Sequence, residues 1–488
     1  MNVNLDAKYE LYINGQWVAP SGGKYFTTTN PATGEKLAEC AEATKEDVDA
    51  AVQAAWAAFP AWRDLEPDKR AAILLKIADI IDENKELLAT IESMDNGKPI
   101  RETMTIDVPY SSDHFRYFAG AIRTEEGSAS ILKDHVGEFM NIILHEPIGV
   151  VGQIVPWNFP FLMAAWKLAP ALAAGDCIVF KPSSTTSLSV LTLVKLIGHL
   201  LPPGVLNVVT GGGSRAGQYM LDHPGFRKLA FTGSTEVGRR FLEYAARSNL
   251  KRIVLELGGK SPFVVLDDVA DYAAVAAQAA AAAFWNMGEN CTANSRIIVP
   301  RKRKDAFTEA LLAELENWRI GDPLDPENNL GSIVSEGQFR TIMGYIEKGK
   351  AEGGHVLTGG APLAIGSGLF IPPTIFDGVT PDMTIVREEI FGPVTAILPA
   401  DSDEEAVGLA NATAYGLQAT LFTEDVTKAH KYARALKAGT VSVNCFSEGD
   451  NTTPFGGYKL SGFGGKDKGR ESHDQYTETK TIFLNLDR

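Results

Sequence analysis

The stretch PIGVVGQIVPWNFPFLMAAWKLAPALAAGDCIVFKPS, residues 147–183, decides the fold of this 488-residue chain. It begins with a short apolar run at 149–155, passes through a helical segment and reaches a second short apolar run at 177–180. Further runs at 206–209 and 228–231 continue the same rhythm. Short apolar runs that alternate with helical segments are typical of a parallel sheet covered by helices. The sequence therefore predicts a doubly wound α/β fold.

A second alternating series begins near Ile253. Its predicted strands are 262–266 and 296–299, with an alanine-rich helix at 273–284 between them. Ahead of both series, residues 45–88 carry apolar side chains at helical spacing and charged residues on the opposite face, which predicts amphipathic helices. We therefore expect two α/β units preceded by a helical region.

Two further segments alternate like exposed strands, a hairpin at 127–146 and an edge strand at 476–486. Unpaired strand edges are liabilities unless something covers them. We therefore predict that a second copy of the chain covers them, in a homodimer or a dimer of dimers.

Composition excludes several classes of protein. With 45% hydrophobic and 22% charged residues the chain has an ordinary globular composition. Its net charge of -15 repels phosphate backbones and anionic membranes, so neither nucleic acid nor membrane is an expected partner. No segment is apolar for long enough to span a bilayer and the start does not resemble a signal peptide, so a cytoplasmic location is expected.

Partial motifs also exclude some chemistry. His145 begins like a zinc-protease HExxH, but Gly149 replaces the second ligand. Residues 233–238 have the outer spacing of a phosphate-binding GxxxxGK[ST] loop without its lysine, and Ala216 replaces the last glycine of a GxSxG elbow. The four cysteines contain no CxxC pair, so we expect neither a disulfide framework nor a metal cluster.

One cysteine stands in an unusual setting. Cys291 follows the polar, glycine-containing stretch 286–290 after the alanine-rich helix, so its sulfur is predicted to lie in a loop where it can meet a ligand. An isolated cysteine is more often a small buried apolar residue. That interpretation is the one we adopt for Cys40, Cys177 and Cys445.

Two polar residues are further candidates. Glu256 lies between Leu255 and Leu257 and precedes a glycine pair, so partial desolvation should raise its pKa toward the range of a general base. The alternative is a solvated residue at a strand end. Asn158 lies in the rigid stretch PWNFP and can donate a hydrogen bond to a developing oxyanion, although such a residue alone is more often part of a turn.

Seven stretches together resemble the aldehyde dehydrogenase superfamily over essentially the whole chain. They are PWNFP (156–160), FKPS (180–183), FTGSTEVG (231–238), LELGGK (255–260), NMGENC (286–291), EEIFGPV (388–394) and PFGGYKLSG (454–462). The resemblance implies a Rossmann-like dinucleotide-binding domain, an α/β catalytic domain and a small β oligomerisation arm. The implied boundaries are 1–126 with 147–257, then 258–470, and 127–146 with 471–488.

The resemblance also implies the chemistry. Cys291 attacks an aldehyde, Asn158 and the Cys291 backbone N–H hold the thiohemiacetal oxyanion, and Lys167 is a further catalytic residue. Hydride transfer to NAD(P)+ leaves a thioester, which water activated by Glu256 hydrolyses. The family branch that transfers the acyl group to coenzyme A generally lacks this carboxylate, so hydrolysis is expected here.

The positions implied to bind the cofactor are Ile154, Pro156, Trp157, Lys181, Ser183, Ser184, Gly213, Gly217, Phe231, Gly233, Ser234, Val237, Leu257, Glu389 and Phe391. Among these, Glu389 and Phe391 are implied to hold the nicotinamide riboside. At the position of Ser184 the family commonly has a glutamate that binds the adenosine ribose and repels a 2'-phosphate. We therefore predict that NADP is tolerated or preferred, with Lys181 and Ser184 near the ribose.

The substrate is the least determined part of the resemblance. Residues 444–457, NCFSEGDNTTPFGG, resemble bacterial γ-glutamyl-aminobutyraldehyde and guanidinobutyraldehyde dehydrogenases of polyamine breakdown. In that interpretation Glu448 and Asp450 attract a cationic or polar tail, and the alternative is that both are solvated loop acids. The predicted apolar tunnel wall suits medium-length aliphatic or aromatic aldehydes equally well and consists of Phe159, Met163, Trp166, Trp285 and Phe455. A non-catalytic relative on the same scaffold is the remaining alternative.

Overall fold

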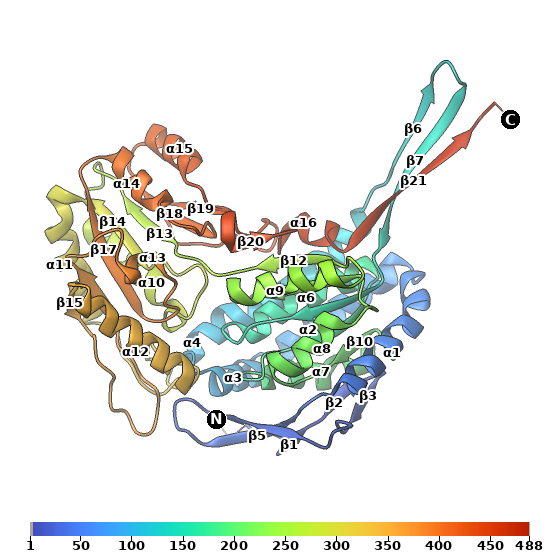
Figure 1. Cartoon of the computed structure of the whole chain (residues 1–488), viewed down its shortest axis with the longest axis horizontal. Helices are drawn as coiled ribbons and strands as arrows, with labels where there is room; N and C mark the ends of the chain where they lie inside the picture. The colour runs from blue at the N-terminus through green and yellow to red at the C-terminus, as the bar shows by residue number, and fades with distance from the viewer. Residues whose placement is uncertain (1–2, 488) are drawn as a thin grey trace.

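The computed structural model describes residues 3–487 and contains two large sheets, each with its own buried core (Figure 1). The first sheet has eight strands in the order β20-β12-β11-β8-β9-β10-β2-β3. They are β2 (Leu11–Ile13), β3 (Gln16–Val18), β8 (Val150–Ile154), β9 (Cys177–Lys181), β10 (Leu206–Val208), β11 (Lys228–Thr232), β12 (Arg252–Glu256) and β20 (Gly462–Phe463). Strands β8 to β12 are parallel, which confirms the α/β prediction.

Helices surround the first sheet, and they include the region predicted to be amphipathic. They are α1 (Lys45–Arg63), α2 (Pro67–Glu83), α3 (Lys85–Asn96), α4 (Ile100–Glu102), α5 (Val108–Ala121), α6 (Pro160–Ala174), α7 (Leu188–Ile197), α8 (Gln218–Asp222), α9 (Thr235–Arg247) and α16 (Gly469–Asp474). Every residue of α6 is buried, which is why its sequence is apolar on all sides. Within residues 3–487, no helix is long and apolar enough to cross a membrane.

The second sheet has seven strands in the order β15-β16-β17-β14-β13-β18-β19. They are β13 (Pro262–Val265), β14 (Arg296–Pro300), β15 (His355–Thr358), β16 (Thr374–Asp377), β17 (Val394–Ala400), β18 (Gln418–Phe422) and β19 (Thr440–Val443). Only the edge pair β15 and β16 is antiparallel among the strand pairs of this sheet in the described residues. The helices of this unit are α10 (Tyr272–Phe284), α11 (Lys304–Leu315), α12 (Glu336–Ala351), α13 (Thr384–Arg387), α14 (Asp403–Asn411) and α15 (Val426–Ala435).

One predicted assignment is wrong. The strand near Ile253, which we placed at the start of the second series, is β12 and pairs in parallel with β11 of the first sheet. The chain therefore enters the second unit only after the glycine turn that follows β12. It also returns, because β20 pairs antiparallel with the other side of β12 near its carboxyl end. An apolar run alone does not show which of two sheets a strand joins.

Three strands form an arm that projects from the body of the molecule (Figure 1). They are β6 (Ser128–Lys133), β7 (Glu138–Pro147) and β21 (Thr477–Asn485), in the order β21-β7-β6. The predicted hairpin and the predicted edge strand are thus neighbours, paired from Thr477 with Pro147 to Asn485 with Phe139. A smaller sheet at the start of the chain consists of β1 (Lys8–Tyr9), β4 (Tyr25–Thr29) and β5 (Lys36–Ala41).

A buried group of charges lies among the helices of the first unit. Lys98 Nζ is 2.7 Å from Asp107 Oδ2, and both side chains are fully buried. Burial raises the pKa of Glu102 to about 8, and the Lys98 charge opposes that rise. The Glu102 carboxylate accepts a hydrogen bond of 3.1 Å from the backbone N–H of Asn286. This charge cluster therefore ties the helices of the first unit to the loop that carries Cys291.

Replacing Lys98 by methionine should lower the free energy of unfolding by about 3–5 kcal/mol, because Asp107 is left as an uncompensated buried acid. Urea unfolding followed by circular dichroism measures the change. The exposed pair of Lys36 and Glu39 provides the control, since a Lys36→Met variant should change stability by less than about 1 kcal/mol. Equal stability of the Lys98→Met variant and the unaltered chain would contradict this account of the cluster.

Candidate active site

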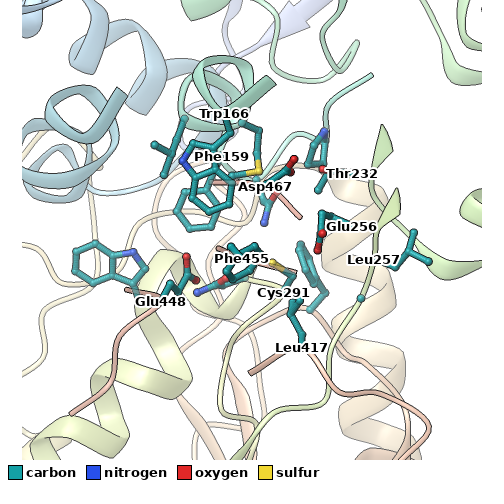
Figure 2. A pocket seen from close by; sticks show the side chains of 18 of the residues that line it. Phe159, Trp166, Thr232, Glu256, Leu257, Cys291, Leu417, Glu448, Phe455 and Asp467 are labelled. Carbon is teal, nitrogen blue, oxygen red and sulfur yellow. The ribbon is translucent and has the colours of Figure 1, made fainter. Parts of the chain in front are cut away.

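A cavity of about 620 Å³ lies where the two units meet, and it brings together the candidate residues from both (Figure 2). One side comes from the segment between β8 and α6 and from the carboxyl ends of β11 and β12. The other side comes from the loop after α10, the segment 389–391 and residues 446–449. Cys291, Glu256 and Asn158 all line this cavity. Parallel strands place their carboxyl ends at one edge, which is where α/β proteins bind ligands.

Cys291 lies in a loop, as predicted. Helix α10 ends at Phe284, and Asn286 and Met287 then adopt left-handed backbone conformations with φ of 53° and 55°. The Asn286 side chain holds the turn by donating hydrogen bonds to the carbonyl oxygens of Glu289 at 2.9 Å and Asn158 at 3.0 Å. Two consecutive residues in this conformation cost free energy, and these hydrogen bonds offset part of the cost. These hydrogen bonds therefore fix the conformation of the loop that carries Cys291.

The glycine pair after β12 permits a close approach of the two units. A Cβ atom on Gly258 would lie 2.0 Å from Glu389 Oε2, and one on Gly259 would lie 2.2 Å from the Cys291 carbonyl oxygen. Any larger residue would push away either the carboxylate or the cysteine loop. The LELGGK stretch therefore combines a functional glutamate with the space that brings the cysteine near it.

Glu256 is the last residue of β12, and it is only 3% exposed. Neither of its carboxylate oxygens makes a hydrogen bond of ordinary geometry within residues 3–487. Burial, with a contribution from the nearby Asp467, raises the pKa of Glu256 well above its usual range, against the opposing charges of Lys167 and Lys466. A buried carboxylate without a partner is unusual for a purely structural residue. Its environment suits a group that accepts protons near neutral pH.

Asn158 precedes α6 and is 3% exposed. Its Nδ2 donates a hydrogen bond of 3.1 Å to the Glu289 carbonyl oxygen in the cysteine loop. A side-chain amide has two N–H groups, so the second can serve an acceptor in the cavity. This arrangement is suitable for stabilising an oxyanion that forms next to Cys291.

The Cys291 thiol is half-buried. Burial, followed by the negative charges of Glu448, Glu389 and Glu256, raises its pKa well above the usual value. The thiol is therefore protonated near neutral pH until a base or a positive charge reaches it.

Lys167 does not line the cavity but acts on it through an ion pair. Its Nζ lies 2.8 Å from Asp467 Oδ2, and the two side chains are 0% and 1% exposed. Asp467 itself lines the cavity, and both charges influence the pKa of Glu256. Lys167 therefore influences the pKa of Glu256 from outside the cavity, next to its ion-pair partner Asp467.

Part of the predicted cofactor set lies in the same cavity. Trp157 and Phe391 meet edge to face with ring centroids 5.2 Å apart, and Glu389 accepts a hydrogen bond of 2.8 Å from the Gly259 N–H. Burial raises the pKa of Glu389 to about 7. The predicted cofactor residues among the cavity lining are Pro156, Trp157, Gly233, Ser234, Leu257, Glu389 and Phe391.

The remaining predicted cofactor residues lie outside the cavity lining, and they are Ile154, Lys181, Ser183, Ser184, Gly213, Gly217, Phe231 and Val237. Ser184 lines a separate hollow of about 530 Å³ together with Glu42, Gly212 and Glu336. Lys181 is buried and donates a hydrogen bond to the Pro182 carbonyl.

The residues present fit a dinucleotide. The buried Thr232 hydroxyl lines the cavity without a hydrogen-bond partner in the described part of the chain. Beside it, Ser234 caps α9 by accepting a hydrogen bond from the Val237 N–H. The free backbone N–H groups at a helix N-terminus favour phosphate groups. The adjoining Trp157 and Phe391 rings can face a flat heterocycle.

The structure places most, but not all, of the predicted substrate residues in the cavity lining. Five aromatic and apolar residues line the cavity as predicted, namely Phe159, Met163, Trp166, Trp285 and Phe455. Glu448 also lines it and hydrogen-bonds with the Thr292 hydroxyl. Asp450 does not line it, because its carboxylate turns back to the backbone N–H and hydroxyl of Thr452 at 2.9 and 2.7 Å.

Our sequence interpretation missed several cavity residues, among them Thr232, Asp467 and Lys468. Thr232 lies within the FTGSTEVG stretch and could have been noted there. Asp467 and Lys468 lie in the short polar stretch GGKDKG, where no period or spacing distinguishes them from a solvated loop. Their burial, 1% and 2% exposed, results from the return of the chain to the first sheet.

Comparisons with known proteins show the family to which the chain belongs. The family model described as "Aldehyde dehydrogenase family" matches residues 17–482. An aminoacetaldehyde dehydrogenase of Pseudomonas aeruginosa is 47% identical over 483 residues, which cover 98% of this chain and 96% of the relative. Aldehyde dehydrogenase B of Escherichia coli is 45% identical and is covered to 94% of its length by 99% of this chain.

Solved structures also match this chain over nearly its whole length. A crystal structure of an indole-3-acetaldehyde dehydrogenase in complex with NAD+ matches with a TM-score of 0.96 at 40% identity, covering 99% of this chain and 98% of that one. A γ-glutamyl-γ-aminobutyraldehyde dehydrogenase of Burkholderia cenocepacia matches with a TM-score of 0.95 at 45% identity, covering 99% and 97%.

The reactivity of Cys291 tests the electrostatics of the cavity. Because burial, and after it three carboxylates, raise the pKa of Cys291, iodoacetamide should alkylate this residue more slowly than the exposed Cys445 at pH 8. A Glu448→Gln variant removes one of these negative charges, so the Cys291 thiolate becomes more populated and alkylation should be several-fold faster. Mass spectrometry of the two cysteine peptides measures both rates, with Cys445 as internal reference. An unchanged Cys291 rate in the variant would show that Glu448 exerts no field at the sulfur.

Proposed function

Since the chain belongs to the aldehyde dehydrogenase family, we propose that it oxidises aldehydes to carboxylic acids with NAD(P)+ through a thioester on Cys291. The resemblance inferred from the seven stretches is thereby confirmed at the level of the family, and so is the aldehyde dehydrogenase fold. The mechanism is supported by one cavity that contains a half-buried thiol, an amide donor and a buried carboxylate whose oxygens have no hydrogen-bond partner within residues 3–487.

The first step of the proposed mechanism is attack of the Cys291 sulfur on the aldehyde carbon. The thiol loses its proton to a base in the cavity, and the carbonyl oxygen becomes an oxyanion. The free N–H of the Asn158 amide and the Cys291 backbone N–H stabilise it. Both donors are held in place before the reaction, because Asn158 and the cysteine loop are hydrogen-bonded to each other.

Bound NAD(P)+ supplies the hydride acceptor for oxidation of the thiohemiacetal to a thioester. Trp157, Phe391 and Glu389 would hold the nicotinamide end of this cofactor. Glu256 then removes a proton from water, which attacks the thioester and releases the acid. The buried pair of Lys167 and Asp467 adjusts the proton affinity of Glu256 from behind.

The cofactor selectivity follows from Ser184. The Ser184 side chain carries no charge. Glu42 and Glu336 line the same hollow, and Glu42 forms an ion pair with Arg215 at 2.6 Å. A neutral hydroxyl at position 184 can bind the ribose without repelling a 2'-phosphate. We therefore propose that NADP+ is used as well as NAD+ or in preference to it.

The domain roles and the assembly are also part of the proposal. Residues 1–126 with 147–257 bind the dinucleotide, 258–470 carry the catalytic cysteine, and 127–146 with 471–488 mediate self-association. The arm supports the last role, because β6, β7 and β21 expose large apolar side chains. These include Ile131, Leu132, Leu144, Phe483 and Leu484. Exposed apolar surface of this kind is typical of an interface, which supports a homodimer or a dimer of dimers.

For the substrate we propose an amino- or amido-aldehyde. Glu448 places a carboxylate in the cavity that Phe159, Trp166 and Phe455 also line, and two relatives are named for aminoacetaldehyde and γ-glutamyl-γ-aminobutyraldehyde. A broad preference for aliphatic or aromatic aldehydes is the alternative that the apolar wall supports. A non-catalytic role is disfavoured by the presence of Cys291, Glu256 and Asn158 in one cavity.

The pH dependence of turnover tests the role of Glu256. Burial raises its pKa, so the ionised base becomes more populated as the pH rises, and kcat should rise with pH over a range above the usual glutamate pKa. Glu256→Gln should lower kcat by about 10²–10⁴-fold and remove this rise. Cys291→Ala should abolish turnover. The assay follows reduced nicotinamide absorbance with butanal, and the exposed Glu243→Gln on α9 is the control. Full activity of either active-site variant would disprove the mechanism.

Cofactor kinetics test the role of Ser184. A Ser184→Glu variant introduces a negative charge next to the proposed 2'-phosphate position, so KM for NADP+ should rise at least tenfold while KM for NAD+ stays equal or falls. Initial rates with both cofactors at saturating aldehyde measure the change. Strict use of NAD+ by the unaltered chain, with no NADP+ turnover, would refute the proposed selectivity.

A further inference from the structure

The wall of the cavity around Trp166 and Phe455 contains a buried lysine that the mechanism does not use. Lys468 lines the cavity and is only 2% exposed. Its Nζ lies 5.1 Å from the centre of the Trp166 ring and 5.5 Å from that of Phe455. Those two rings meet edge to face and are part of the predicted substrate wall. The ammonium group is therefore part of the wall that Trp166 and Phe455 form, and Figure 2 shows these two rings.

Lys468 has an unfavourable backbone conformation. Lys468 has φ of 60° and ψ of 171°, a region that residues other than glycine rarely adopt. Its Nζ donates a hydrogen bond of 2.7 Å to the Glu448 carbonyl oxygen and makes a longer contact of 3.4 Å with that of Gly449. An ammonium group has three N–H donors, so one remains for a ligand. Strain of this kind at a cavity wall points to a functional role.

A negative charge lies in the same cavity. The Glu448 carboxylate lines it, and after burial it is the next contributor to the raised pKa of Cys291. No ion pair of 4.0 Å or less joins Lys468 to Glu448 among residues 3–487. Lys468 and Glu448 thus line the same wall of the cavity without forming an ion pair with each other, alongside the carboxyl groups of Glu256, Glu389 and Asp467.

We propose that Lys468 and Glu448 together select aldehydes whose far end is dipolar, such as an amide or an amino-acid group, over those ending in a simple ammonium or a simple carboxylate. A singly charged end is attracted by one group and repelled by the other. A dipolar end can offer its carbonyl oxygen to Lys468 and its N–H to Glu448. The buried Trp166 Nε1, which has no hydrogen-bond partner in residues 3–487, adds a donor at the same wall.

This inference rests on the proposed function. It narrows the proposed substrate from amino- or amido-aldehydes to amido-aldehydes. Four aldehydes of similar length test it: 3-acetamidopropanal, 3-aminopropanal, succinate semialdehyde and pentanal. We expect kcat/KM of the unaltered chain to be highest for 3-acetamidopropanal, by about tenfold over pentanal, as for one charge-assisted hydrogen bond.

Two variants should shift the preference in opposite directions. Lys468→Met, which keeps a side chain of similar length without the charge, should lower the ratio of 3-acetamidopropanal to pentanal about tenfold and favour 3-aminopropanal. Glu448→Gln should instead favour succinate semialdehyde. The exposed Lys437→Met is the matched control and should leave all ratios unchanged. Thermal unfolding of each variant shows whether it is folded.

The failure of this inference is distinguishable from that of the proposed function. If pentanal is oxidised as well as 3-acetamidopropanal and neither variant changes the ratios by more than about twofold, the dipolar selection is overturned while aldehyde oxidation stands. If the unaltered chain oxidises none of the four aldehydes, the proposed function is overturned and the substrate inference with it.

Discussion

The close contact between the glycine turn after β12 and the cysteine loop is the constraint on which the site depends. The Cys291 sulfur belongs to one unit and the Glu256 carboxylate to the other, so they can meet in one cavity only if the two backbones nearly touch. Gly258 and Gly259 supply that space, because added Cβ atoms there would lie within 2.2 Å of the Glu389 carboxylate and the Cys291 carbonyl. The hydrogen bonds between Asn158, Asn286 and Glu289 then fix the loop from the other side.

Burial of charged groups gives the cavity its chemical character. In a region of low polarity, the charged form of an isolated acid is disfavoured and the influence of neighbouring charges is strong. This is why the pKa of Glu256 is raised. It is also why the ion pair of Lys167 and Asp467 influences that pKa, although Lys167 does not line the cavity. The separate cluster around Lys98 has a supporting function, since it ties the helices of the first unit to Asn286.

The same physics applies where the substrate tail would lie. Aromatic rings provide apolar surface and little selectivity between tails of equal size, whereas a single desolvated charge discriminates strongly. Lys468 and Glu448 introduce two such charges of opposite sign, held on segments that the chain brings back after completing the second sheet. These two residues therefore reach the cavity late along the chain, whereas Phe159, Met163 and Trp166 of the same wall come from the segment around α6.

The sequence by itself determined the α/β class, the hairpin and edge strand of the arm, the position of Cys291 in a loop, and Glu256 at the end of a strand. Each of these depends on local pattern, such as alternation, helical spacing or a glycine turn after an apolar run. The tertiary structure alone decided that the strand near Ile253 joins the first sheet, that Asp450 turns away from the cavity, and that Asp467 and Lys468 line it. These features depend on contacts between residues far apart in the chain. For example, Lys167 meets Asp467 across 300 positions, and no local pattern encodes such a pairing.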